Sequence, residues 1–158
     1  MSKLMMTKTG YDDIMTKIDA LNQDLKIANQ SVAEGIESRD FREDSTFSVA
    51  VEERTKIQNK IREMEDIVNN CTIAQIDSSI DFIDFGKSAE LLNVDTGDVR
   101  AFTIVGAYES DPKNGKISYL SPVGMSMMGS KVGDEFEVIT PAKEICWEVL
   151  KIFIDRPL

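Results

Sequence analysis

Two series of apolar or small residues flank the stretch from residue 36 to residue 47. Within each series the spacing alternates between three and four, which is the heptad seam of a coiled coil. The only exception is Arg54, in the second series. The first series consists of Tyr11, Ile14, Ile18, Leu21, Leu25, Ala28, Val32 and Gly35, and the second of Phe47, Ala50, Ile57, Ile61, Met64, Val68 and Cys71. The pattern predicts two amphipathic helices joined by a short connection.

The two series are related by a reflection about Phe41. It pairs Ile14 with Val68, Ile18 with Met64, Leu21 with Ile61, Leu25 with Ile57, Val32 with Ala50, Gly35 with Phe47, and Ala28 with Arg54. Small residues thus face large ones where two large side chains would collide. The register predicts an antiparallel helical hairpin with its tip near Phe41. At 1.5 Å per residue, a helix from Tyr11 to the tip is roughly 45 Å long.

Composition narrows the class of protein. The chain has 158 residues, a net charge of −10 and no histidine. The negative charge argues against autonomous binding to duplex DNA, which needs a basic surface. The absence of histidine excludes Ser-His-Asp and Cys-His nucleophiles.

Cys71 and Cys146 are far apart in the sequence and form no zinc motif, so we expect buried, reduced thiols. No apolar run is long enough to cross a membrane, and we expect a cytoplasmic monomer.

The pattern changes after Cys71 to short alternating runs, which predicts an α+β chain. Strands are expected at 85–94, 99–106, 116–120, 135–140 and 144–154, with a turn at 95–98. The last strand slips its apolar phase between Val149 and Leu150, which indicates a β-bulge. Ser121 followed by Pro122 predicts the start of one short helix. We therefore expect a coiled-coil hairpin over residues 1–75 and a small, mostly antiparallel sheet domain over residues 76–158.

Carboxylates gather at the expected tip. The acidic residues are Asp40, Glu43 and Asp44, preceded by Glu34 and Glu37 and interleaved with Arg39 and Arg42. Mg²⁺ is usually held by one or two carboxylates together with waters and substrate phosphates. The tip is therefore half of a metal site that another macromolecule would have to complete. An acidic turn that is simply solvated is the alternative interpretation of the same residues.

Several segments resemble, in order and spacing, the bacterial transcript cleavage factors of the GreA/GreB family, with GreA favoured. They are residues 6–11 (MTKTGY), 39–47 (RDFREDSTF), 95–97 (DTG), 104–106 (IVG), 115–118 (GKIS), 121–122 (SP) and 131–135 (KVGDE). The resemblance extends over essentially the whole chain. It implies an FKBP-like fold for the second half.

The resemblance also implies a function. In that family the coiled coil enters the secondary channel of RNA polymerase, and the FKBP-like half binds the channel rim. Two tip acids, which match Asp40 and Glu43, help to hold the second Mg²⁺ of the polymerase and stimulate cleavage of backtracked RNA near its 3′ end. The factor has no cofactor of its own and is not an autonomous enzyme. The rim contact matches Ser121, Pro122 and Met127.

The sequence departs from the family pattern around the tip. Arg39 replaces a glycine, Asp44 replaces a neutral residue, and Ile36 and Val51 stand at positions that are often basic. These changes affect the expected contact with the RNA 3′ segment, for which Arg39 and Arg42 are candidates. Two alternatives follow: a channel-binding protein that inhibits the polymerase without cleavage, and an FKBP-like prolyl isomerase with a helical handle.

Overall fold

The structure is a computed structural model that describes residues 3–37 and 45–154, without the side chains of Ser45 and Thr46. Contacts divide the chain into two compact units, one formed by residues 12–70 and the other by residues 1–11 together with 71–158. The sequence alone places the boundary between residues 75 and 76 and does not separate residues 1–11 from the hairpin. None of the described helices is long and apolar enough to cross a membrane.

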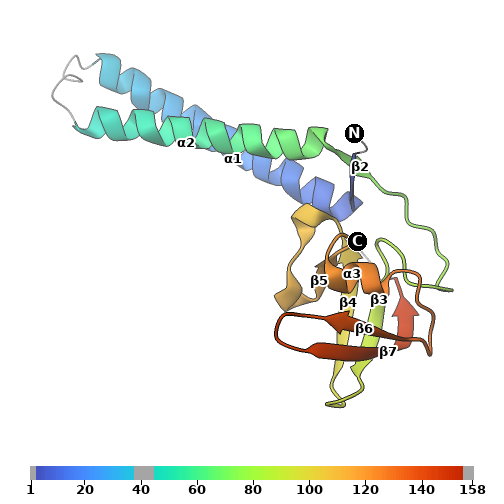
Figure 1. Cartoon of the computed structure of the whole chain (residues 1–158). Helices are drawn as coiled ribbons and strands as arrows, with labels where there is room; N and C mark the ends of the chain where they lie inside the picture. The colour runs from blue at the N-terminus through green and yellow to red at the C-terminus, as the bar shows by residue number, and fades with distance from the viewer. Residues whose placement is uncertain (1–2, 38–44, 155–158) are drawn as a thin grey trace. The chain divides into compact units, whose positions relative to one another are not determined.

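Two antiparallel helices, α1 (Lys8–Glu37) and α2 (Ser45–Asn69), form the first unit, except that the first four residues of α1 belong to the second; they are shown in blue and green in Figure 1. Burial follows the predicted seam: Ile18, Val32 and Ile61 are buried, and the remaining apolar seam positions are half-buried or buried. Gly35 lies opposite Phe47 as predicted, because a Cβ on Gly35 would be 2.6 Å from the Phe47 ring. The hairpin and its register at this layer are therefore confirmed.

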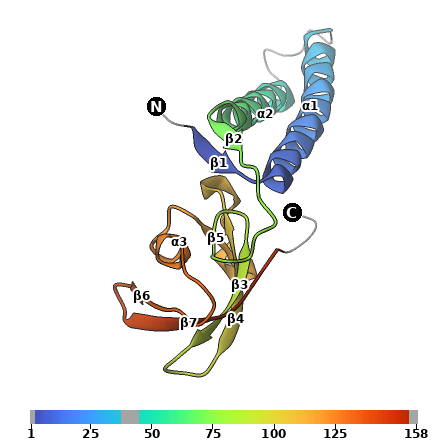
Figure 2. The same ribbon diagram turned by 90° about the vertical axis from the view of Figure 1, so that its right-hand side faces the viewer.

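The seam ends at Val68, one heptad position earlier than predicted. We expected Cys71 to continue it, but α2 ends at Asn69 and Cys71 begins strand β2 (Cys71–Ile73). This strand pairs in parallel with β1 (Leu4–Met6), with Leu4 opposite Cys71 (Figure 2). The expectation for Cys71 was wrong because backbone pairing with the N-terminal segment replaces packing between helices.

A five-stranded sheet forms the centre of the second unit, in the order β5-β4-β3-β7-β6. Its strands are β3 (Ser88–Asn93), β4 (Val99–Val105), β5 (Lys116–Ser118), β6 (Glu135–Ile139) and β7 (Glu144–Phe153). All neighbours pair antiparallel except β4 and β5, which are parallel. Two short 3₁₀ turns, Ala107–Glu109 and Pro112–Asn114, connect β4 to β5. The predicted mostly antiparallel sheet is confirmed.

The predicted bulge lies in β7. Glu90 of β3 pairs with Lys151 and Leu91 pairs with Val149, so Leu150 has no partner in the ladder. On either side of the bulge, Val149 and Ile152 both reach the core, which also contains Phe102, Trp147 and Met127. The extra residue therefore lets the apolar side chains on both sides of the bulge in this ten-residue strand face the core. Helix α3 (Pro122–Met127) packs on one face of this sheet (Figure 2).

Candidate functional site

The acidic tip lies in the seven-residue segment 38–44, which joins α1 to α2. Asp40 and Glu43, and likewise Arg39, Arg42 and Asp44, are outside the described residues. The structure does describe the helix ends beside them. There the absence of a side chain at Gly35 gives the ring of Phe47 its place in the seam. Ile36, the residue after Gly35, is 54% exposed, so its aliphatic side chain is largely in solvent beside the segment 38–44.

Within residues 3–37 and 45–154, no group of three or more Cys, Asp or Glu side chains is arranged to hold a metal ion. The expected Mg²⁺ ligands, Asp40 and Glu43, therefore remain a prediction from the sequence. Their two carboxylates supply fewer ligands than the six that an octahedral Mg²⁺ ion requires, so other groups would have to complete the site.

The predicted contact loop forms helix α3, and its N-terminus is built as expected. Ser121 is the N-cap: its hydroxyl accepts a hydrogen bond from the Gly124 amide at 3.0 Å and donates one to the Ser118 carbonyl at 2.7 Å. Pro122 occupies the first helical position and is exposed. A side chain at Gly124 would come within 2.0 Å of the Ser118 carbonyl oxygen, so a glycine allows α3 to lie close to β5.

Met127 corrects our expectation of a binding residue on this helix. Its side chain is fully buried in the core of the sheet domain, so it has no surface to offer a partner. The large apolar side chains exposed at this place are instead Met125 of α3, at 60%, and Leu120, two residues before the helix, at 47%. Helical spacing was the available signal, since residues three apart share a face: Pro122 and Met125 share the outer face, and Gly124 and Met127 the inner one.

Glu109 was not predicted, and it organises the start of α1. Thr7 is the N-cap, with its hydroxyl accepting a hydrogen bond from the Gly10 amide at 3.0 Å. The Glu109 carboxylate accepts hydrogen bonds from the Thr7 amide at 3.0 Å and the Gly106 amide at 2.8 Å, and one from the Thr7 hydroxyl. All four residues belong to the same compact unit. The first turn of α1 is thereby tied to the sheet domain.

Lys87 is a second polar group that the sequence analysis missed. Its side chain is 1% exposed, with Nζ 2.8 Å from Asp77 Oδ1 and 5.2 Å from the centre of the Phe82 ring. Apart from this ion pair, Nζ has no hydrogen-bond partner among the described residues. The hydrogen bond to Lys87, and then one to the Ser79 amide, hold the pKa of Asp77 below its usual range. The pair fastens the segment before β3 to the sheet.

Both cysteines are half-buried and free. Burial is the main cause that raises the pKa of Cys71, and the Glu109 carboxylate adds to it. The pKa of Cys146 is raised by burial and then by its acidic neighbours, Glu135 first. A raised pKa lowers the thiolate fraction at neutral pH, so neither thiol has the character of a nucleophile.

These elements define a class of protein: a long antiparallel helical hairpin with an acidic connection, joined to a mostly antiparallel sheet domain with one capped, exposed helix. Residues 4–73 match the description "Transcription elongation factor, N-terminal", and residues 77–153 match "Transcription elongation factor, GreA/GreB, C-term". The chain belongs to the GreA/GreB family of transcription elongation factors.

Individual relatives agree with this assignment. The chain is 33% identical over 157 residues to transcription elongation factor GreA of Nautilia profundicola, a match that covers 96% of this chain and 95% of the relative. It is 30% identical over 154 residues to GreA of Rhodospirillum rubrum, covering 96% and 98% of the two chains. Among solved structures, GreA factor homolog 1 of Thermus thermophilus is 28% identical, with 95% and 98% covered and a TM-score of 0.45. The family assignment rests on the sequence matches.

Proposed function

We propose that this chain binds RNA polymerase, inserts its helical hairpin into the secondary channel and stimulates cleavage of backtracked nascent RNA. The observation that carries the proposal is the position of Asp40 and Glu43 between the ends of two long helices. Helix α1 has 30 residues and α2 has 25, so α1 is roughly 45 Å long. A hairpin of that length is suited to deliver a short acidic segment into a narrow channel. A polymerase partner also implies a cytoplasmic location.

The chemistry that we assign to the tip is shared with the polymerase. Asp40 and Glu43 would contribute carboxylate oxygens to a Mg²⁺ ion, while the polymerase and an RNA phosphate contribute the rest. Such an ion lowers the pKa of a bound water and offsets the charge that develops on the phosphate. Arg39 and Arg42 are the candidate contacts to the RNA 3′ segment. Without the polymerase, the chain would have neither a complete metal site nor catalytic activity.

Binding at the channel rim is assigned to the outer face of α3. Ser121 and Pro122 set the start of that helix, and Met125 and Leu120 supply exposed apolar surface. Methionine suits such a surface because its side chain is flexible and polarizable. Met127 supports the surface from inside the core.

A second candidate function is that of a channel-binding inhibitor. The presence of a third acidic residue, Asp44, in the sequence of the connection favours it. A third carboxylate in the segment 38–44 offers the Mg²⁺ ion an alternative position away from the reacting phosphate. The prolyl isomerase alternative is not proposed, because Trp147, the only tryptophan of the chain, is 6% exposed and packs edge to face on Phe102.

The test is RNA cleavage in a stalled, backtracked elongation complex at fixed Mg²⁺. Addition of the chain at saturating concentration should release short RNA from the 3′ end, and the chain mixed with free RNA should release none. Binding without cleavage, accompanied by slower elongation, would reject this function and establish the inhibitor instead.

A further inference from the structure

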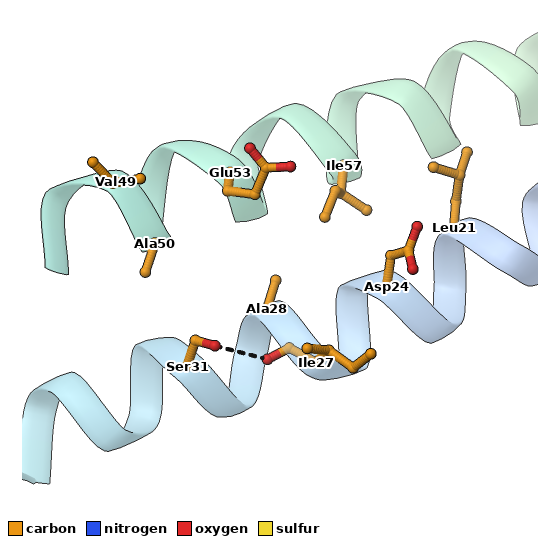
Figure 3. A pocket seen from close by; sticks show the side chains of 9 residues that line it. All are labelled: Leu21, Asp24, Ile27, Ala28, Ser31, Val49, Ala50, Glu53 and Ile57. Atoms are coloured by element: carbon orange, nitrogen blue, oxygen red, sulfur yellow. Dashed lines mark hydrogen bonds between the residues drawn. The ribbon is translucent and has the colours of Figure 1, made fainter. Parts of the chain in front are cut away.

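An open groove of about 680 Å³ lies between α1 and α2, entirely within the hairpin unit (Figure 3). It is found where the seam carries small residues, Ala28 on α1 and Ala50 on α2. Leu21 and Ile57 line it with their larger side chains. The two alanines lie in different layers of the seam, and each leaves less of the space between the helices filled than a leucine at the same position would.

The edges of the groove are unusually apolar for a solvated helix pair. Ile27 is 65% exposed and Val49 is 62% exposed, and both line the groove. They are two of the three large apolar residues that are exposed on the described part of the hairpin, the third being Ile36. A single exposed aliphatic residue is ordinary. Ile27 and Val49 add exposed aliphatic surface, one from each helix, to a hollow that is itself lined mainly by apolar residues, and a partner could cover this surface.

The charged residues that line the groove have one sign, although Arg54, the seam residue opposite Ala28, lies nearby without lining it. Asp24 and Glu53 are the only charged residues among those that line it, and both are acidic. The chain as a whole carries a charge of −10. An occupant therefore has to be apolar at its centre and basic beside it. A second copy of this chain would bring further negative charge against Asp24 and Glu53, which electrostatic complementarity disfavours.

We propose that this groove receives an aliphatic side chain with a neighbouring lysine or arginine, presented by RNA polymerase. The aliphatic group fills the hollow beside Ala28, and the cation lies against Asp24 and Glu53. This inference rests on the proposed function and adds a contact site midway along the hairpin. Its role is to hold the hairpin at a defined depth, separately from the metal chemistry of the tip.

The first test fills the hollow. Ser31 lines the groove, is exposed, and its hydroxyl donates only to the Ile27 carbonyl, at 3.3 Å (Figure 3). Ser31→Trp should therefore fold normally and occupy the space with an indole ring. Its affinity for core RNA polymerase, measured by competition with labelled wild-type chain, should fall by about tenfold or more. Asn29→Trp is the matched control, because Asn29 is exposed on the same helix and does not line the groove.

The second test reverses the charges. The double variant Asp24→Lys/Glu53→Lys should slow association with the polymerase and weaken the dependence of the rate on salt. The control is Asp19→Lys/Glu65→Lys, which changes the net charge equally on exposed residues of the same two helices. An equal loss in both double variants would indicate general charge attraction and overturn the assignment of a cation to the groove.

The outcomes separate this inference from the proposed function. If wild-type chain does not bind the polymerase, both are rejected. If it binds and Ser31→Trp binds as tightly as Asn29→Trp, the groove proposal alone is overturned. If wild-type chain sediments as a dimer that Ser31→Trp dissociates, the occupant is a second copy and the proposal is wrong. Circular dichroism of each variant verifies that the helices form.

Discussion

Thr7 and Glu109, 102 residues apart in the sequence, complete the N-cap of α1 together. In an ordinary capping box, a Glu at the third helical position bonds back to the amide of the cap residue. Here that position is Gly10, and Glu109 from the turn after β4 makes the bond to the Thr7 amide at 3.0 Å. A Cβ on Gly10 would lie 2.1 Å from Glu109 Oε1. The missing side chain of the helix is thus the space that the carboxylate occupies.

This arrangement predicts that Gly10→Ala lowers the stability of the protein, which is the opposite of the usual effect of this change in a helix. In a helix interior, the change from Gly to Ala normally stabilises by about 0.5–1 kcal/mol. At this position the methyl group would displace the Glu109 carboxylate and break charge-assisted hydrogen bonds, so we expect destabilisation by about 1–3 kcal/mol. Urea unfolding of the full chain measures the difference.

The control for this prediction is the same change in a Glu109→Ala background. With the carboxylate removed, Gly10→Ala should become neutral or stabilising, because nothing then occupies the space. A loss of equal size in both backgrounds would show that Glu109 is not the cause. Glu144→Ala, on an exposed residue of β7, serves as the background without a role in the cap.

The ion pair of Lys87 with Asp77 predicts a pH-dependent stability. Asp77→Asn removes the anion beside a buried ammonium group, and the melting temperature of the sheet domain should fall by a few degrees at neutral pH. The folded-state pKa of Asp77 lies below the ordinary value of about 3.9. Its stabilisation is therefore present above that value and is lost as pH falls through the lowered pKa.

The measurement is thermal unfolding of wild type and variant from neutral pH down to the range below ordinary carboxyl pKa values. The gap between the two melting temperatures should close at the acidic end. A gap that stays constant would assign the effect to the loop itself and not to the charge. Asp95→Asn, at an exposed turn position, should show neither the gap nor its pH dependence.

Arg54, the exception in the heptad pattern, is predicted to weaken the hairpin. It is half-buried, and its Nε is buried without a hydrogen-bond partner among the described residues. An unpaired buried donor costs about 1–3 kcal/mol, so Arg54→Met should raise the helical melting temperature. Circular dichroism measures it, with Arg62→Met on an exposed position as the control. Lower stability of Arg54→Met would mean that the guanidinium makes a net favourable contact.

The hairpin and the sheet were predictable because their signals are local and periodic. The reflected heptads placed Gly35 opposite Phe47, and the phase slip beside Leu150 located the bulge. In each case the positions of apolar residues alone determine which face is buried. A shift of the register would expose every apolar side chain on that face of the helix or strand to solvent. The Ser121–Pro122 pair similarly determines where α3 begins.

The missed features depend on contacts between distant segments. Strand β1 pairs with β2 although the 64 residues from 7 to 70 separate them, and three-residue strands carry no periodic signal. Glu109 is one of 28 acidic residues, and nothing local marks it as a cap for α1.

The error for Met127 was of another kind. Helical spacing in α3 would have separated it from Met125, but a six-residue helix is too short for its phase to be evident.

The corrected face of α3 gives a paired prediction. Met125→Asp changes an exposed side chain, so it should leave the fold intact and weaken polymerase binding by about tenfold. Met127→Asp places a charge in the core and should destabilise the sheet domain by more than about 3 kcal/mol. Competition binding measures the first and urea unfolding the second. Unchanged affinity of Met125→Asp would exclude the outer face of α3 as the rim contact.

The acids of the tip give the prediction that separates a cleavage factor from an inhibitor. Asp40→Asn and Glu43→Gln keep the size of each side chain and remove its charge. Each should lower the rate of RNA cleavage by about 10²-fold or more, which corresponds to about 2.7 kcal/mol in the activation free energy. Polymerase affinity should change little, because a metal ligand that acts in the transition state contributes to the rate and not to binding.

Asp44→Asn is the matched control for these two variants, since it removes the same charge from the same segment. It should lower cleavage much less, because Asp44 stands where the family pattern has a neutral residue. The measurement is the cleavage rate of a backtracked complex at saturating chain and fixed Mg²⁺. Equal losses from Asp44→Asn and Glu43→Gln would mean that the pair of metal ligands is wrongly assigned. A faster rate with Asp44→Asn would show that the third acid draws the ion away from the reacting phosphate, so that wild-type protein is an attenuated factor.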